Sequence, residues 1–508
     1  MQRIAIIDVG SNSARLVITQ IYKSGAFNMV YNQKEALRLA QKVDAKGYLT
    51  ETAFADTIEC INSFATMCKL FGADKIVAVA TAAIRNAPNG KALVTAVNNA
   101  TKINLDIISG ETEAYMSYLG VVNTLSIKDC LIFDLGGGST ELILVRDRRI
   151  VHSISLPLGC VNLTTAFNTR NKMSVEVYNK LHKKVLEYTS KAPWLNDLKL
   201  PLIGVGGTAR TVAKMEQRRS KYFSSKIHNY QFPTINLKRT FKTLQPTTFE
   251  DRKKIPGLSA ERADIIMAGM SIIKILADRT RSSQLIISGC GLREGLFMQY
   301  YSNLKKQPLL TQDILARSTE NVLALYSTDP QHSQHITNLA LAMFDGWQSL
   351  HKLDARWRLL LKTAALLHDI GITINYYSHA RHSAYMIDNA RIFGLSHKEQ
   401  VMAAIIAGWH NGISRNLIKS KQYKDILTAT DMRRLGRMAL LLALAESLDY
   451  SQTNQISSVR PSLGKKGALL SITSETVPSI ELYQLKQQFK WFKKAFSKNL
   501  QLKTKEST

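Results

Sequence analysis

The chain has 508 residues, which is too long for one hydrophobic core, so we expect roughly two to four domains. Hydrophobic residues make up 45% and charged residues 21%, a balance that is ordinary for core-forming proteins and excludes general disorder. The net charge of +28 favours a polyanionic partner, which could be nucleic acid, polyphosphate, a phosphorylated nucleotide or an anionic membrane surface. A basic surface with no specific ligand accounts for the charge equally well, so charge alone does not choose.

Several sequence features indicate the compartment. The five cysteines are dispersed and form no CxxC pair, which is typical of reduced cytosolic thiols and not of a disulfide framework or a zinc site. Asp8 interrupts the first apolar run too early for a signal peptide. The most apolar later stretch, RMALLLALAESLD, carries charges and is shorter than a membrane span. We therefore expect a soluble, cytoplasmic protein with no membrane partner.

Residues 1–306 alternate short apolar runs, such as RIAIID, KIVAVAT, CLIFDL and QLIISG, with longer amphipathic stretches, and this alternation predicts an α/β architecture. From about Gln307 helical periodicity takes over, and SNLKKQPLLTQD is the predicted joint. After Tyr450 we expect a polar loop, a hairpin in GALLSITSETVPSIELY, and a lysine-rich amphipathic helix that packs on the chain instead of forming a polyanion-binding arm. The expected domains are 1–125, 126–306, 307–455 and 456–508.

Two turns rich in small residues, more than a hundred residues apart, each follow an apolar run that ends near an aspartate. IAIIDVGSNSARLVI carries Asp8 and IFDLGGGSTELI carries Asp134. Glycine lets an anion approach the backbone N–H groups closely, serine and threonine hydroxyls add donors, and the aspartate can hold a divalent cation. The pair predicts two hairpin turns that face one another and clamp a phosphate between them.

Three further segments complete the candidate site. In LIGVGGTART, the residues Gly206, Gly207 and Thr208 precede a predicted helix whose N-terminus can bind an anion, and GCGLREGLF supplies a fourth loop. No GxxxxGK[ST] motif occurs, which excludes a P-loop NTPase. ISGETEAYMSYLGV predicts a helix with Glu111 and Glu113 in its first turn. These acids either complement the helix dipole or supply a general base.

In chain order, DVGSNSARLVI, SGETEAYMSYLGV, DLGGGSTEL, LPLGCVNLT, GVGGTART and SGCGLREGL resemble the motifs of the Ppx/GppA family of exopolyphosphatases and guanosine pentaphosphate phosphohydrolases. The resemblance extends through the first 300 residues and, more loosely, to the C-terminus. It implies two actin/Hsp70/sugar-kinase-like (ribonuclease H-like) domains, with the ligand phosphate between Asp8 and Asp134. A small C-terminal α+β segment would follow an all-α domain.

The resemblance also implies the chemistry: Mg²⁺-dependent hydrolysis of a terminal phosphoanhydride by an in-line water. Glu113 matches the glutamate that activates the water, with Glu111 as the fallback. Asp134 and Glu141 match acids of the Mg²⁺ and phosphate site. Arg85 matches an arginine near the phosphate, where a guanidinium can grip two oxygens. The residues that match the phosphate-binding loops are Asp8, Ser11, Asn12, Ser13, Gly136, Gly137, Gly138 and Ser139.

The helical part contains His335, then LLHDIG with His368 and Asp369, then LAESLDY with Asp449. This H…HD…D order resembles the HD superfamily of metal-dependent phosphohydrolases. The resemblance implies a second divalent metal in an HD-like domain. Imidazole and carboxylate ligands from neighbouring helices suit such an ion. The alternative is a relic whose polar residues only hydrogen-bond within a helical core. Further possible ligands or phosphate contacts are His379, His382 and His410.

We expect an exopolyphosphatase that releases terminal orthophosphate from inorganic polyphosphate, because the excess of basic residues could provide a positively charged channel for this long polyanion. The alternatives are a phosphohydrolase acting on the guanosine pentaphosphate pppGpp and a non-catalytic sensor of a phosphorylated nucleotide. A sugar-kinase-like phosphotransferase is less well supported, since only GVGGTART resembles an adenosine-binding signature. No specific nucleic-acid partner is expected. The resemblance suggests a homodimer.

Overall fold

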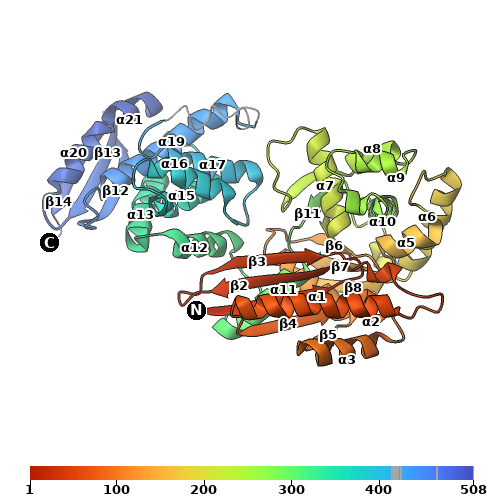
Figure 1. The fold of residues 1–508 in the computed structure, drawn as a ribbon. Helices are drawn as coiled ribbons and strands as arrows, with labels where there is room; N and C mark the ends of the chain where they lie inside the picture. The colour runs from red at the N-terminus through yellow and green to blue at the C-terminus, as the bar shows by residue number, and fades with distance from the viewer. Residues whose placement is uncertain (414–422, 424–425, 465–466, 507–508) are drawn as a thin grey trace. The chain divides into compact units, whose positions relative to one another are not determined.

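The computed structural model describes residues 1–413, 423, 426–464 and 467–506, which form two compact units, Met1–Gln312 and Asp313–Thr508 (Figure 1). The segment 307–312 stays with the first unit because the Asn123 side chain holds it. The Asn123 amide donates to the Leu309 carbonyl at 3.0 Å and accepts from the Thr311 N–H at 2.7 Å. The units therefore change at Gln312, slightly after the expected boundary at residue 306.

The first unit contains two mixed sheets whose strands come from separate stretches of the chain. The strands of the first sheet are β1 (Gln2–Val9), β2 (Ala14–Ile21), β3 (Phe27–Glu35), β4 (Lys75–Ala80) and β5 (Leu105–Ile107). The strands of the second sheet are β6 (Cys130–Leu135), β7 (Thr140–Arg146), β8 (Arg149–Leu156), β9 (Leu202–Val205), β10 (Tyr230–Pro233) and β11 (Gln284–Ile287).

Both sheets repeat one topology. The first has the order β3-β2-β1-β4-β5, in which β1 to β3 are antiparallel neighbours and β4 and β5 join in parallel. The second has the order β10-β11-β9-β6-β7-β8, which repeats that pattern with β6 in the place of β1 and adds β10 as an antiparallel edge strand. The β1–β2 and β6–β7 turns are thus equivalent, which explains why the chain contains two similar turns.

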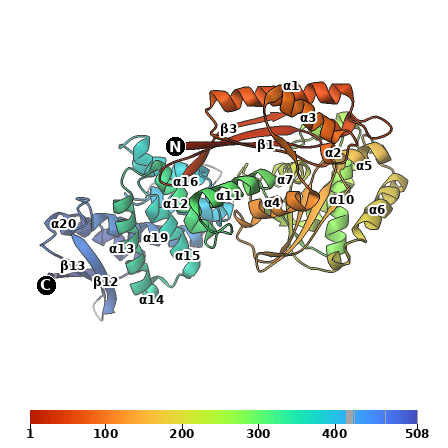
Figure 2. The ribbon, with the colours of Figure 1, turned by 90° about the horizontal axis from the view of Figure 1, so that it is seen from below.

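Helices cover both sheets. They are α1 (Glu51–Leu70), α2 (Ala82–Arg85), α3 (Gly90–Thr101), α4 (Gly110–Val122), α5 (Cys160–Phe167), α6 (Val175–Thr189), α7 (Gly207–Arg219), α8 (Thr234–Leu244), α9 (Phe249–Lys253), α10 (Ile266–Thr280) and α11 (Leu292–Lys305). Figure 2 shows α1 and α3 over one face of the first sheet, where they share a core with β1 and β2. Because both faces of β1 are covered, its residues 4–7 are all buried.

The helices α4 and α11 lie in the core that joins the two sheets, since apolar residues of both helices and of both sheets form one cluster. Their backbones approach so closely that only glycine fits at the contact. A Cβ at Gly120 would lie 2.2 Å from the Gly291 carbonyl oxygen, and one at Gly295 would lie 1.9 Å from the Met116 carbonyl oxygen. This contact fixes the start of α4, where Glu113 lies, relative to both sheets.

The second unit begins with helices and ends with a small sheet (Figure 1). The helices are α12 (Ile314–Tyr326), α13 (Pro330–Gly346), α14 (Gln348–His351), α15 (Ala355–Leu366), α16 (His379–Asn389), α17 (His397–Gly408) and α19 (Ala429–Ser447). They are followed by β12 (Ile456–Gly464), β13 (Gly467–Ser474), α20 (Ser479–Gln487), α21 (Phe489–Phe496) and β14 (Leu500–Glu506). Within the described residues, no helix is long and apolar enough to cross a membrane.

The C-terminal hairpin lies earlier in the chain than expected. The strand β13 pairs with β12 before it, whereas the second half of the expected hairpin, SIELY, begins α20. The sequence does not predict β12, because most of its residues are exposed and polar and it contains Pro461. Proline is tolerated there because β12 is an edge strand. The lysine-rich helix α21 buries Phe492, whose ring lies 5.3 Å from that of Trp347, and exposes Lys493.

Candidate functional site

The two equivalent turns have the same internal geometry. The Gly10 N–H donates to the Ser13 carbonyl at 3.1 Å, and the Gly136 N–H donates to the Ser139 carbonyl at 3.0 Å. In each turn the carbonyls of two residues are also bound by a later backbone segment: Ser11 and Asn12 by Ala40 and Arg38, and Gly136 and Gly137 by Cys160 and Val161. Because other backbone segments already bond to these carbonyls, the N–H groups are the part of each turn that can bind an anion.

The turns lie directly against one another, although they come from different sheets. A Cβ at Gly138 would lie 2.8 Å from Ser11 Oγ, and a Cβ at Gly137 would lie 3.0 Å from Ser11 Cβ. Glycine is therefore needed in the second turn so that the first can approach it. Ser11 and Ser139 are both buried at this contact. The structure thus brings the two predicted phosphate-binding turns together.

The strand register assigns different chemistry to the two halves. Asp8 on β1 pairs with Arg15 on β2, whereas Asp134 on β6 pairs with Glu141 on β7. The equivalent positions therefore carry an arginine in one half and a second acid in the other. Asp134 accepts a hydrogen bond from the Ser117 hydroxyl. The second half is consequently the more acidic side of the site.

Four carboxyl groups gather beside the turns, and burial raises the pKa of each. The pKa of Asp8 is raised to about 6 and that of Glu113 to about 7, with the charge of Asp134 adding to both shifts. The pKa of Asp134 is raised, and that of Glu141 is raised well above its usual value by burial and by the charges of Glu113 and Asp134. Such mutual repulsion is what a bound divalent cation would relieve.

Of the two candidate bases, only Glu113 points toward this acidic group. Its carboxylate accepts from Arg85 Nη1 at 2.8 Å, and its side chain is 12% exposed. Arg85 Nη1 also donates to the Ile108 carbonyl at 3.1 Å, so the guanidinium is held from two sides. Glu111 lies exposed in the first turn of α4, where an acid complements the helix dipole. The geometry therefore favours Glu113 over Glu111 as the base.

The third glycine turn lies against β6. Gly206 has φ +96°, a left-handed conformation that favours glycine, and a Cβ there would lie 2.4 Å from the Leu135 carbonyl oxygen and 3.4 Å from Asp134 Oδ1. Gly207, at the start of α7, leaves room for the Arg262 guanidinium, which a Cβ would overlap. Thr208 is buried on α7 against Gly269.

Several residues of the site were missed by the sequence reasoning. Ser117 lies one turn after Glu113 on α4, and Ser155 on β8 donates to Glu141 Oε1 at 2.8 Å. A group of arginines also surrounds the acids: burial, together with the charges of three other arginines, lowers the pKa of Arg210 to about 10. These three are Arg15, Arg293 and Arg262.

The arginines could have been found from the sequence. Arg15, Arg210 and Arg293 each lie inside one of the quoted motifs, DVGSNSARLVI, GVGGTART and SGCGLREGL. All are half-buried, so they can reach a ligand while their charges remain poorly solvated. Arginines that lie together beside buried carboxylates are suited to a ligand with several negative charges.

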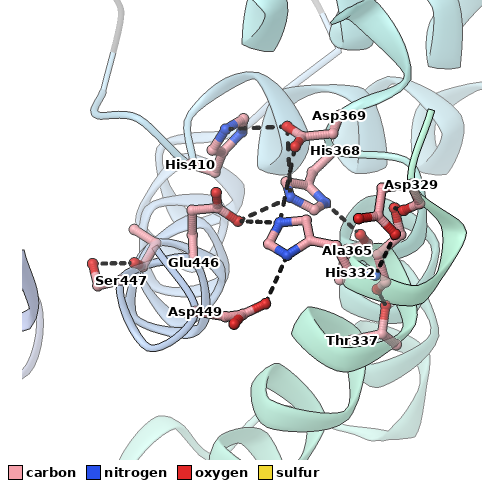
Figure 3. Close-up of polar contacts among 12 residues, drawn as sticks. Asp329, His332, Thr337, Ala365, His368, Asp369, His410, Glu446, Ser447 and Asp449 are labelled. Carbon is pink, nitrogen blue, oxygen red and sulfur yellow. Dashed lines mark hydrogen bonds and ion pairs between the residues drawn. The ribbon is translucent and has the colours of Figure 1, made fainter. Parts of the chain in front are cut away.

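In the second unit, the group of side chains that could hold a metal ion differs from the expected set at two positions. His332, Glu446, His368 and Asp369 come together, with their ligand atoms within 4.8 Å of one another (Figure 3). Of the expected ligands that lie outside this group, His335 lies three residues after His332 on α13, and Asp449 lies three residues after Glu446, just beyond the end of α19.

The displaced residues have other contacts. Asp449 lies behind His332 and accepts from its Nδ1 at 2.8 Å (Figure 3). His335 instead faces the backbone of Ile456, and its buried Nε2 has no hydrogen bond within the described part of the chain. A second group consists of Asp369, His379 and His410. His382, one turn after His379 on α16, belongs to neither group.

The charges in this cluster compensate one another. Burial alone would lower the pKa of His332, but its bond to Asp449 and the nearby Glu446 carboxylate raise it to about 10. Burial likewise opposes protonation of His368, but the charges of Asp369 and Glu446 raise its pKa to about 9. Burial and the charge of His368 lower the pKa of His410 to about 4. Without an ion, protonated imidazoles would balance the acids.

Comparison with known proteins finds one family match in each of the two units. The model of the Ppx/GppA phosphatase family matches residues 17–304, and that of Ppx/GppA phosphatase domain III matches residues 314–502. Guanosine-5'-triphosphate,3'-diphosphate pyrophosphatases of Aeromonas salmonicida and Vibrio vulnificus are 25% and 27% identical to the chain over 453 and 449 residues. Each covers 87% of this chain, and the matches span 87% and 86% of those proteins.

Solved structures show the same relationship. An exopolyphosphatase from Cytophaga hutchinsonii is 25% identical with a TM-score of 0.55 and covers 61% of this chain and 100% of its own. A Ppx/GppA family member from Aquifex aeolicus is 30% identical with a TM-score of 0.52 and covers 60% of this chain and 98% of its own. The family expected from the motifs is confirmed: the chain belongs to the Ppx/GppA phosphatase family.

Proposed function

We propose that the first unit hydrolyses a terminal phosphoanhydride bond, with attack by water and release of inorganic phosphate. The observation that carries the proposal is the position of Glu113. Its carboxylate is fixed by Arg85 at 2.8 Å and lies in the same acidic group as Asp134 and Glu141. With a pKa raised to about 7, Glu113 can accept a proton from water near neutral pH.

The neighbouring groups supply the remaining functions. The N–H groups of the two facing turns would bind the oxygens of the terminal phosphate. Arg210 and the arginines around it would offset the charge of the phosphates, and Arg85 would share its guanidinium between Glu113 and a phosphate oxygen. Catalysis would then depend mainly on the positioning of the water and the neutralisation of charge.

The acidic group fits a Mg²⁺ ion. Asp134 and Glu141 face one another across the β6–β7 pair; Asp134 accepts a hydrogen bond from the Ser117 hydroxyl, and Glu141 accepts one from the Ser155 hydroxyl. One or two carboxylates suffice for Mg²⁺, because water and phosphate oxygens complete its six ligands. We therefore assign Asp134 and Glu141 as the ligands, with Asp8 on the opposite turn. When bound there, Mg²⁺ would neutralise phosphate charge and orient the terminal phosphate.

The preferred substrate is proposed to be pppGpp, because the Aeromonas and Vibrio relatives, which align with most of this chain, are named for guanosine-5'-triphosphate,3'-diphosphate. Polyphosphate is the second candidate. The net charge of +28 favours it, and the Cytophaga structure is named an exopolyphosphatase. Polyphosphate, the substrate expected from the sequence, is therefore the alternative to pppGpp. A homodimer stays a prediction.

Phosphate release with Mg²⁺ tests the proposal, using pppGpp and long-chain polyphosphate at matched concentrations of terminal phosphate. We expect release from both, with the higher kcat/KM on pppGpp, and we expect Glu113→Gln to abolish both. Faster release from polyphosphate would reverse the substrate assignment and make the basic surface a substrate track. If neither substrate is hydrolysed but pppGpp binds, the protein is a sensor and the hydrolase proposal fails.

A further inference from the structure

Four histidines of the second unit share one arrangement, in which Nδ1 is held from behind. A backbone carbonyl can only accept a hydrogen bond, so a ring that bonds one through Nδ1 carries its proton there and leaves the Nε2 lone pair free when neutral. The pairs are His368 with Ala365 at 2.7 Å, His379 with Tyr376 at 3.0 Å, His410 with Ala407 at 2.6 Å, and His332 with the Asp449 carboxylate at 2.8 Å.

The free Nε2 atoms converge on two carboxylates, and Figure 3 shows this for His332, His368 and His410. Glu446 Oε2 lies 3.0 Å from His368 Nε2 and 3.4 Å from His332 Nε2. Asp369 Oδ1 lies 3.6 Å from His368 Nε2 and 3.4 Å from His379 Nε2, and Asp369 Oδ2 lies 3.9 Å from His332 Nε2. Lone pairs that face anions at these distances repel them unless a cation lies between.

The spacing of these atoms is that of ligands on a common ion. Ligands at about 2.0–2.2 Å from a metal and roughly 90–110° apart lie about 2.8–3.6 Å from one another. Most of the distances around Glu446 and Asp369 fall in this range. His379 Nε2 and His410 Nε2 are 3.2 Å apart, and the Asn411 amide, also 3.2 Å from His379 Nε2, is a competing donor to that atom.

Two buried atoms in the middle of the cluster lack a hydrogen bond among the described residues: His332 Nε2 and Asp369 Oδ1. His332 is 2% exposed and Asp369 is 9% exposed, so bulk water does not satisfy either group. Both atoms point into the cluster, toward the side chains that would share an ion with them (Figure 3). Buried polar atoms are almost always paired, so these two indicate a ligand at this position.

We propose that the second unit binds two divalent transition-metal ions that share Asp369. His332, His368, Asp369 and Glu446 hold the first ion, and Asp369, His379 and His410 hold the second. Mixed imidazole and carboxylate donors favour ions such as Mn²⁺, Fe²⁺ or Zn²⁺ over Mg²⁺. The second ion has three protein ligands, which leaves coordination positions for water or a phosphate oxygen. This site is independent of the Mg²⁺ site proposed in the first unit.

Direct metal binding by the full chain tests the proposal without any variant. The protein is stripped with a chelator, titrated with Mn²⁺ in excess Mg²⁺, and measured by elemental analysis and electron paramagnetic resonance. We expect about two Mn²⁺ per chain, with the spectrum of a coupled pair. Absence of retained Mn²⁺, and of Zn²⁺ or Fe²⁺ in parallel titrations, would overturn the proposal and leave a cluster of imidazolium–carboxylate pairs.

Variants locate the ions. His379→Gln should remove about one equivalent of Mn²⁺, whereas His382→Gln, one turn later on the same helix, should leave both equivalents in place. Asp369→Asn should weaken both sites. Equal losses in His379→Gln and His382→Gln, or two retained equivalents in Asp369→Asn, would overturn the assignment. Circular dichroism checks folding, and the pair on α16 decides the question if Asp369→Asn does not fold. Phosphate release by the first unit is recorded separately.

Discussion

The acidic site of the first unit and the histidine cluster of the second unit both gather buried carboxylates, but they neutralise them differently. In the first unit, Asp134 and Glu141 come from adjacent strands of one hairpin, and arginines surround the acids. In the second unit, the acids come from separate elements and face histidine Nε2 atoms, which can bind a cation when the imidazole is neutral. Arginine stays charged and suits a phosphorylated ligand, whereas neutral imidazole suits a transition metal.

The same difference decides how well the sequence locates each site. A hairpin turn places its residues by sequence order, so the acids at the end of β6 and the start of β7 are adjacent once the turn is recognised. Helices present residues three apart on nearly the same face. His332 and His335 form such a pair on α13, Glu446 and Asp449 are spaced in the same way at the end of α19, and in both pairs the earlier residue lies in the cluster. Only the packing of the helices makes that choice.

The largest effect should come from Glu113, because it is the proposed base. Glu113→Gln keeps the shape of the side chain but cannot accept a proton, so kcat for phosphate release should fall by about 10²–10⁴-fold. Glu111→Gln is the matched control: it lies two residues earlier on α4 and is exposed, so kcat should change little. Steady-state phosphate release measures both variants. Equal losses in the two would remove the distinction between Glu113 and Glu111.

The next effect tests the choice within a helical pair. His332→Gln removes a proposed metal ligand and should weaken Mn²⁺ binding by more than the roughly 10–100-fold loss typical of residues that only orient a ligand. His335→Gln, three residues later on α13, should bind Mn²⁺ as the wild type does. Competition titration with a chelating dye measures the affinities. A larger loss of Mn²⁺ affinity in His335→Gln than in His332→Gln would show that His335, the residue expected from the sequence, is the ligand.

A smaller effect is expected at Asp449, which orients His332 without contacting the ion. Asp449→Asn keeps the shape of the side chain and weakens the acceptor for the His332 Nδ1–H group, whose nitrogen lies 2.8 Å from Asp449 Oδ2. We expect about a tenfold loss of Mn²⁺ affinity, at the low end of the range for such supporting residues. The number of ions bound should stay the same at saturation, and elemental analysis at high Mn²⁺ checks this. Loss of one equivalent at saturation would make Asp449 a ligand.

Local sequence patterns and tertiary packing determine different parts of this structure. The duplicated topology was accessible because turn glycines and buried strands leave strong local patterns. The supporting contacts were less accessible: Ser117 and Ser155 reach their acids only after α4 and β8 pack against β6 and β7. The strand β12 was missed because its exposed residues show little alternation of apolar and polar positions. Local patterns therefore located the candidate turns, and tertiary packing supplied their surroundings.

The smallest effect should be a shift in pH dependence. Burial raises the pKa of Glu113 to about 7, and a carboxylic acid protonated below that pH cannot act as a base. Activity should therefore fall as the pH decreases through about 7. The Arg85 hydrogen bond and charge lower this pKa, so Arg85→Gln should move the acidic limb to higher pH.

Arg85→Lys separates the charge from the geometry of the guanidinium. Lysine keeps the positive charge, so the acidic limb should stay nearer its wild-type position than in Arg85→Gln, even if kcat/KM falls because one planar donor group is lost. The logarithm of kcat against pH, measured at saturating Mg²⁺ and substrate, gives the position of the limb in each protein. A limb that does not move in Arg85→Gln would show that a group other than Glu113 controls it, and the base would then have to be sought among the other acids beside the turns.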